Sequence, residues 1–157
     1  MTERRRIDLT ELLDVEHVRL GMHAGGWESA VRALAGLFRD DEVTGDFERA
    51  IVERERQYPT GLPTKPFGVA LPHADPNLVL KPRLAVLTLE SPVVFGEMGN
   101  PDREVLAHWV IGIALPESEK ERQTEMLTWL IEKVQRQQWV ETVLNAVSAE
   151  KIVALFR

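Results

Sequence analysis

Residues 105–115, VLAHWVIGIAL, form a long and nearly uninterrupted apolar stretch. A strand that is apolar at consecutive positions is typical of a sheet covered on both faces. Residues 83–90, RLAVLTLE, are the other strong strand candidate, and residues 91–102 between them read as a short strand and a turn. The sequence therefore predicts two strands here, the second of them in a sheet covered on both faces.

Helical patterns precede and follow these strands. Apolar residues that recur at three and four positions predict amphipathic helices, and Asp8 and Glu11 have the spacing of a capping box. One helical pattern places Arg54 on its buried line and should stop just before Pro59, because the residue before a proline avoids helical geometry. The predicted helices occupy residues 8–16, 27–38, 47–58, 118–136, about 140–147, and a last short stretch from residue 148.

Shorter strands are predicted for residues 17–22 and 67–71, so strands and helices are interleaved along the chain. With 157 residues the chain fits one domain. We expect a layered α/β domain over residues 1–157, with a mixed β-sheet flanked by helices and residues 1–7 as a flexible arm.

Composition excludes several classes of function. The formal net charge of −6 disfavours nucleic acid as a partner, because phosphate backbones require a concentrated basic surface. The chain has no cysteine, which excludes disulfides and thiolate chemistry. It shows neither a signal-peptide pattern nor an apolar run long enough to insert into a membrane, so we expect a cytoplasmic protein.

Histidine is the most informative candidate for chemistry. None of the four histidines has the local spacing of a metal site, and His17, His23 and His108 suit structural positions. His73 differs, because it follows a buried strand and a proline and opens into a loop, where α/β folds place ligands and chemistry. Its neutral imidazole could act as a nucleophile or as a base, or it could simply be packed.

Arg54 is the candidate partner of His73. A guanidinium on a buried line needs an anion, which could be a phosphoryl group held by its two-pronged fork. The alternative is an ordinary salt bridge to Glu97, Asp102 or Glu104. The residues alone leave both interpretations open.

Two linked motifs carry a family resemblance. RERQYPTGL (54–62) and GVALPHAD (68–75) together resemble the enzyme IIA domains of the fructose and mannitol class of the bacterial phosphoenolpyruvate:sugar phosphotransferase system (PTS). The similarity extends through VVFGE and VIGIALPES to the last helices. It implies a phosphotransferase component with the mannitol-type IIA fold and no metal or cofactor.

The resemblance also implies roles for individual residues. The phosphorylated histidine falls on His73, with Nε2 as the expected phosphorylated nitrogen and Nδ1–H held by a backbone carbonyl. The arginine of the family's R-E motif falls on Arg54. Gln123 takes the place of a second family histidine, and glutamine can donate a hydrogen bond but cannot titrate. Backbone amides around Thr60 and Gly61 are expected as further donors to the phosphoryl oxygens.

Partners follow from the same resemblance. His73 would accept a phosphoryl group from phospho-HPr and pass it to a cysteine of a cognate IIB protein, with the membrane component IIC involved indirectly. Gln123, together with a longer loop before His73 than in mannitol-type domains, looks like the galactitol-type IIA proteins. This suggests uptake of galactitol or a related sugar or polyol. The alternatives are a regulatory IIA protein of the nitrogen-related branch, or a binding domain without phosphorylation.

Overall fold

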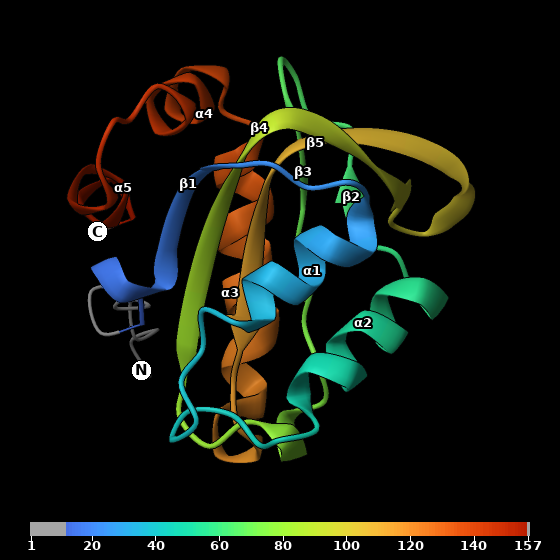
Figure 1. Cartoon of the computed structure of the whole chain (residues 1–157), viewed down its shortest axis with the longest axis vertical. Coiled ribbons are helices and arrows are strands. Elements are labelled where there is room, and N and C mark those ends of the chain that lie inside the picture. The colour runs from blue at the N-terminus through green and yellow to red at the C-terminus, as the bar shows by residue number, and fades with distance from the viewer. Residues whose placement is uncertain (1–11, 157) are drawn as a thin grey trace, which may run out of the picture.

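A long antiparallel hairpin forms the centre of the sheet in the computed structural model, which describes residues 12–156 (Figure 1). Strands β4 (Arg83–Glu97) and β5 (Asn100–Ala114) pair from Arg83 opposite Ala114 to Glu97 opposite Asn100. Both predicted strands are confirmed. The strand and turn predicted over residues 91–102 are present, with the turn at residues 98–99, but the strand is not separate, because it continues β4 across a register irregularity that accommodates Pro92.

Three shorter strands complete a five-stranded mixed sheet in the order β1-β4-β2-β3-β5, with β4 also paired to β5. Strand β1 (Val18–Met22) runs parallel to β4, and β3 (Gly68–Ala70) runs parallel to β5. Strand β2 (Gly61–Leu62) is antiparallel to β3 and meets Glu97 at the far end of β4. The mixed sheet expected from the sequence is therefore confirmed.

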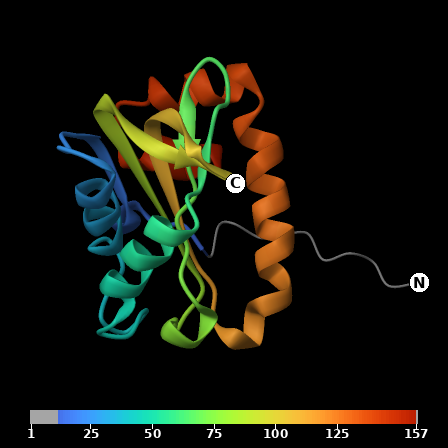
Figure 2. The same ribbon diagram turned by 90° about the vertical axis from the view of Figure 1, so that its right-hand side faces the viewer.

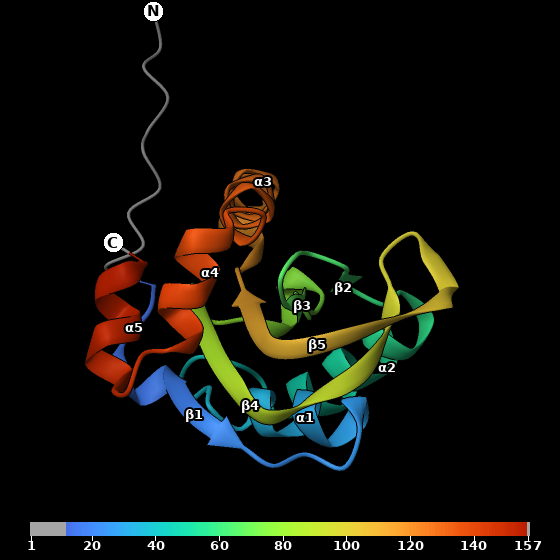
Figure 3. The same cartoon turned by 90° about the horizontal axis from the view of Figure 1, so that it is seen from above.

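Helices cover both faces of this sheet, as the view from above shows (Figure 3). Helices α1 (Trp27–Ala35) and α2 (Phe47–Gln57) lie on one face. Helices α3 (Lys120–Val134), α4 (Gln137–Leu144) and α5 (Ala149–Leu155) lie on the other. These elements confirm the predicted helices of residues 27–38, 47–58, 118–136 and beyond, with ends that differ by a few residues.

Alternation along the central strands divides the core between the two faces. Leu84 and Val86 pack against α3, α4 and α5, whereas Ala85 and Leu87 pack against α1 and α2. Successive side chains of a strand point to opposite faces, so a sheet with helices on both sides requires apolar residues at every position. This explains why the central strands read as continuous apolar runs.

The first predicted helix, residues 8–16, is wrong where it can be checked. Residues 12–14 are not helical, and a single 3₁₀ turn, η2 (Val15–His17), follows them. The carbonyl of Leu12 accepts a hydrogen bond from the Leu84 amide at 2.7 Å, so this segment lies beside the start of β4 instead of coiling. The proposed capping pair Asp8 and Glu11 and the arm of residues 1–7 lie outside the described residues.

Further 3₁₀ turns mark the ends of two strands. Turn η3 (Pro76–Leu78) follows His73, and η4 (Glu117–Glu119) leads from β5 into α3. Figures 1 and 2 both show η3 beside the first turn of α3, at one end of the sheet. The connections that leave β3 and β5 therefore meet at this end.

Close backbone packing explains Gly68 in β3. A Cβ atom at this position would lie 2.3 Å from the carbonyl oxygen of Leu106 in the neighbouring strand. We predict that Gly68→Ala lowers the free energy of unfolding by about 1–3 kcal/mol, because the strands must move apart. Urea denaturation measures this, and Gly45→Ala is the control, since a Cβ there meets nothing within 4 Å. Equal stability of the two variants would contradict the packing described.

Candidate functional site

His73 lies where two parallel strands of the sheet end. Strand β3 ends at Ala70, the buried residues Leu71 and Pro72 follow, and His73 then bridges to Ile113 near the end of β5. The Ile113 amide donates to the Pro72 carbonyl at 3.1 Å, which fixes the backbone immediately before the histidine. The position expected from the sequence, at the carboxyl end of a buried strand, is confirmed.

The His73 ring is oriented by its own backbone neighbourhood. Its Nδ1 atom lies 2.9 Å from the carbonyl oxygen of Leu71. A carbonyl can only accept, so Nδ1 carries the proton in this hydrogen bond and the neutral ring keeps its lone pair on Nε2. A backbone carbonyl thus selects the tautomer, as the sequence analysis expected.

Electrostatics keeps this ring neutral. Burial is the main cause that lowers the pKa of His73, and the positive charge of Arg54 lowers it further. The hydrogen bond to the Leu71 carbonyl opposes these effects and only partly offsets them. Near neutral pH, His73 therefore presents an uncharged imidazole with an available lone pair.

Arg54 acts on His73 from a different position than predicted. The buried line of α2 runs through Phe47, Ile51 and Glu55, whereas Arg54 is exposed and its guanidinium lies 5.7 Å from the centre of the Tyr58 ring. The prediction that Arg54 lies on the buried line is wrong, because the next residue, Glu55, occupies the buried position on the apolar face of α2. Within residues 12–156 no ion pair joins Arg54 to a carboxylate at the salt-bridge positions considered, Glu97, Asp102 and Glu104.

Thr60 and Gly61 are held by protein groups. The Thr60 amide, expected as a donor to phosphoryl oxygens, donates instead to Glu55 Oε2 at 2.8 Å, so that expectation is corrected for this amide. Gly61 pairs with both β3 and β4, and a Cβ there would lie 2.5 Å from the Gly96 carbonyl oxygen. Close packing against the backbone of β4 therefore explains why residue 61 is a glycine.

Gln123 lies in the first turn of α3 and is half-buried. That turn is at the same end of the sheet as η3, which follows His73 (Figure 2). Among the described residues no hydrogen bond joins Gln123 to His73. The fold brings the two residues to one end of the domain, with no hydrogen bond between them in this part of the chain.

Glu55 is the residue of this site that the sequence analysis missed. Its side chain is 4% exposed, and burial raises its pKa to about 7 against the opposing effects of two hydrogen bonds from Thr60 and the charge of Arg54. The signal was present, since Glu55 stands four residues after Ile51 and eight after Phe47 on the apolar stripe. An acidic residue at such a position needs a specific partner.

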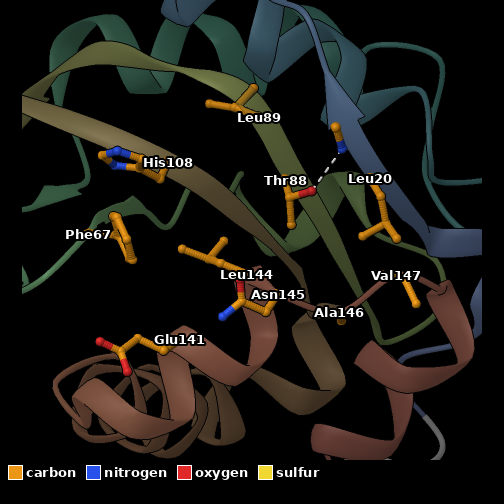
Figure 4. Close-up of a pocket in the computed structure, with 11 residues that line it drawn as sticks. Leu20, Phe67, Thr88, Leu89, His108, Glu141, Leu144, Asn145, Ala146 and Val147 are labelled. Carbon is orange, nitrogen blue, oxygen red and sulfur yellow. Dashed lines mark hydrogen bonds between the residues drawn. The ribbon is translucent and has the colours of Figure 1, made fainter.

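One pocket of the described residues lies away from His73. It has a volume of about 720 Å³ and is lined by residues of β1, β4, β5 and α4, including His108, and by Phe67 just before β3 (Figure 4). His108 and the Ile113 neighbour of His73 are separated by about 17 Å along β5, at roughly 3.3 Å per residue. His73 consequently does not face this pocket.

The other histidines have structural surroundings. His17 is buried as a structural residue, with its Nε2 2.8 Å from the buried carboxylate of Glu42. The His108 ring packs 4.7 Å from Phe67, as expected of a packed residue, although its buried Nδ1 has no hydrogen-bond partner among the described residues. Neither residue lies with His73.

Residues 12–156 offer neither a cluster of metal ligands nor a membrane-spanning helix. No group of three or more acidic or histidine side chains is arranged to hold a metal ion in this part of the chain. None of its helices combines the length and apolarity needed to cross a bilayer.

The sequence of this chain matches one protein family over nearly its whole length. Residues 11–157 match the family described as "Phosphoenolpyruvate-dependent sugar phosphotransferase system, EIIA 2". The chain belongs to this family. It is therefore an EIIA-type domain, a phosphotransfer component of the PTS, and the central part of the resemblance is confirmed.

Solved structures show the same fold for this EIIA domain. Nitrogen regulatory protein IIA-Ntr from Neisseria meningitidis has a TM-score of 0.78 at 23% identity, covering 94% of this chain and 98% of that one. The IIAMtl chain in a complex with phosphorylated IIBMtl from Escherichia coli has a TM-score of 0.72 at 24% identity, covering 92% and 98%. Crystalline IIA mannitol from Escherichia coli has a TM-score of 0.70 at 23% identity, covering 92% and 98%.

The mannitol-type IIA fold is thus confirmed. A comparison with curated protein sequences finds no match. The galactitol-type subclass is not established by these similarities, which include both mannitol and nitrogen-regulatory proteins.

The raised pKa of Glu55 predicts a specific dependence of stability on pH. The folded EIIA domain holds the Glu55 proton more tightly than the unfolded chain, so this contribution to stability is complete below the ordinary pKa of 4.5 and is lost as the pH rises through about 7. Replacing Glu55 with glutamine removes this titration. We predict that the difference in unfolding free energy, wild type minus Glu55→Gln, falls between pH 5 and pH 8, with a slope of at most about 1.4 kcal/mol per pH unit.

Urea denaturation at several pH values measures that difference. Glu48→Gln is the control, because Glu48 is an exposed carboxylate on the same helix. A difference for Glu55→Gln that stays constant over this pH range would contradict the raised pKa.

Proposed function

We propose that His73 is a phosphoryl carrier, which accepts the group on Nε2 from phospho-HPr and passes it to a cysteine of a cognate IIB protein. The hydrogen bond between Nδ1 and the Leu71 carbonyl carries this proposal, because it leaves the lone pair on Nε2. The lowered pKa of His73 supports it further, since a protonated ring has no lone pair with which to attack phosphorus.

The transfer needs no proton movement at His73. In the first step the Nε2 lone pair forms a bond to phosphorus while the nitrogen–phosphorus bond of the donor histidine breaks, and its electron pair returns to the donor ring. In the second step a cysteine thiolate attacks the phosphorus and the bond to Nε2 breaks. Throughout, Nδ1–H remains bonded to the Leu71 carbonyl.

Arg54 and Gln123 supply the surroundings of the phosphoryl group in this proposal. Phosphoryl transfer depends mostly on positioning and on dispersal of charge over the oxygens. Arg54 is exposed, and its positive charge already acts on His73. Its guanidinium can donate two parallel hydrogen bonds to phosphoryl oxygens. Gln123 would add a neutral donor, which positions the group without the charge that would hold it too tightly.

An exposed surface around Arg54 suits protein partners that dock in turn. Tyr58 is 65% exposed beside the Arg54 guanidinium, and aromatic and arginine side chains are enriched in interfaces. The net charge of −6 would steer a basic partner face. The Escherichia coli complex of IIAMtl with phosphorylated IIBMtl supports a IIB partner. In this proposal IIC is engaged only indirectly, and the domain acts in the cytoplasm.

Sugar uptake is the preferred physiological role. Gln123 and the long loop before His73 favour a galactitol-type component that serves galactitol or a related sugar or polyol. The alternative is a regulatory IIA of the nitrogen-related branch, favoured by the similarity to the Neisseria protein. Transfer from His73 to a IIB protein encoded beside this gene supports uptake, whereas phosphorylation-dependent binding to other proteins without such transfer supports regulation.

Removing His73 tests the proposal. Incubated with phosphoenolpyruvate, enzyme I and HPr, the wild-type protein should gain one acid-labile phosphoryl group, and His73→Ala should gain none, because the only nucleophile of the site is lost. Intact-mass spectrometry measures this gain. His23→Ala is the control, since the His23 side chain is 79% exposed and its nearest carboxylate, at 4.0 Å, is Glu90. Equal mass gain in His73→Ala and wild type would refute the proposal.

Removing Arg54 tests its role in holding the phosphoryl oxygens. We expect Arg54→Ala to fold normally and to accept the phosphoryl group roughly 10- to 100-fold more slowly, because charge stabilisation and orientation are lost. Rapid-quench measurement of transfer from phospho-HPr gives the rate. Arg49→Ala, which removes an exposed arginine of the same helix, should retain the wild-type rate. Unchanged transfer in Arg54→Ala to both partners would remove Arg54 from the site.

A further inference from the structure

Glu55 is a buried carboxylate that phosphoryl transfer itself does not use. It stands on the apolar face of α2 with 4% exposure, among residues that pack against the sheet. A carboxylate in such surroundings is costly unless its oxygens are satisfied, and its retention therefore points to a specific partner. That partner is Thr60, which follows α2 by three residues.

Both oxygens of Glu55 are occupied by this one threonine. The Thr60 amide donates to Oε2 at 2.8 Å, and the Thr60 hydroxyl donates to Oε1 at 2.8 Å. Two hydrogen bonds from separate donors of one residue fix both its backbone and its side-chain rotamer. These two bonds hold the turn that connects α2 to β2. Figure 1 shows where this turn lies.

The Thr60 hydroxyl connects this turn to the strand that leads to His73. Its oxygen accepts a hydrogen bond from the Leu71 amide at 3.0 Å. An amide can only donate, so the hydroxyl oxygen accepts from Leu71 and the hydroxyl hydrogen can point to Glu55. Each of these two hydrogen bonds therefore favours the hydroxyl orientation that the other requires. The carbonyl of the same Leu71 accepts from His73 Nδ1 at 2.9 Å.

We propose that Glu55 is a positioning residue for His73, acting through Thr60 and Leu71 to hold the ring in the Nδ1–H tautomer with Nε2 free for phosphorus. Glu55 itself does not touch the reacting atoms. The purpose assigned to this series of hydrogen bonds rests on the proposed function, because only an attacking Nε2 requires that tautomer.

The series matters because the tautomer is not the one that imidazole prefers alone. Free histidine in water favours the proton on Nε2, so an accurately placed acceptor must hold it on Nδ1. Leu71 can place its carbonyl accurately only if its own backbone is fixed. Loosening the Glu55 or Thr60 link should therefore restore part of the ordinary tautomer population at His73.

The experiment observes the His73 ring directly in the unphosphorylated protein. Ring ¹⁵N chemical shifts and long-range ¹H–¹⁵N correlations distinguish a protonated Nδ1 from a protonated Nε2. We expect wild type to show the Nδ1–H tautomer, and Thr60→Val and Glu55→Gln to show a mixture with Nε2–H. Phosphoryl acceptance from phospho-HPr should slow roughly 10- to 100-fold in both variants, because the nucleophile is misplaced.

Matched variants separate positioning from general destabilisation. Thr60→Ser retains the hydroxyl and should restore the Nδ1–H tautomer, and Glu48→Gln removes an exposed carboxylate of α2 and should change nothing. The double variant Glu55→Gln/Thr60→Val should be no worse than Thr60→Val alone, because the two residues act in series. If Glu55→Gln proves too unstable to fold, Thr60→Val and Thr60→Ser decide the same question.

Failure of this inference differs from failure of the proposed function. A wild-type tautomer in Thr60→Val or in folded Glu55→Gln overturns the positioning role, whatever the transfer rates. If the effects of Glu55→Gln and Thr60→Val on the His73 tautomer add up in the double variant, the two residues do not act in series. If wild-type protein accepts no phosphoryl group, the proposed function fails, whereas the ring spectra still decide whether Glu55 and Thr60 control the His73 tautomer.

Discussion

The hydrogen bond between His73 Nδ1 and the Leu71 carbonyl is the contact on which this account depends. It lies within three consecutive residues, yet its geometry is fixed by distant parts of the chain. The Pro72 carbonyl accepts from the Ile113 amide of β5, and the Leu71 amide donates to the Thr60 hydroxyl in the turn between α2 and β2. A histidine on an exposed loop would lack both supports. The sheet thus holds the His73 ring in one orientation, in which Nδ1 is hydrogen-bonded and Nε2 keeps its lone pair.

The layered architecture explains why this nitrogen is placed at an edge and not in a cavity. Strands β3 and β5 run in parallel and end together, and the turns that leave them meet the first turn of α3. The pocket near His108 lies elsewhere. An edge position suits a group that must be reached by successive protein partners, because a closed pocket would admit a small molecule but exclude a protein-borne phosphoryl donor.

Much of the fold could be predicted from local patterns. The apolar runs of β4 and β5 indicated a doubly covered sheet, and Pro59 marked the end of α2. Leu12 shows the limit, since its carbonyl binds the Leu84 amide, a partner 72 residues later that no local pattern reveals. At the site, the position of His73 could be read from its strand and proline, and the burial of Glu55 from its place four residues after Ile51 on the apolar stripe. The exposure of Arg54 depends on the helix rotation that packing selects. Long-range contacts, which periodicity does not encode, decided the conformations of Leu12 and Arg54.

We propose that His73 Nε2 carries the phosphoryl group while Nδ1 stays bonded to the Leu71 carbonyl. NMR spectroscopy of the protein with ¹⁵N-labelled histidine rings, after phosphorylation by phospho-HPr, tests this most directly, because the one-bond ³¹P–¹⁵N coupling locates the bond. We expect this coupling at Nε2 of His73, with Nδ1 still protonated. Coupling at Nδ1, coupling at another histidine, or no coupling at any histidine would contradict this proposal.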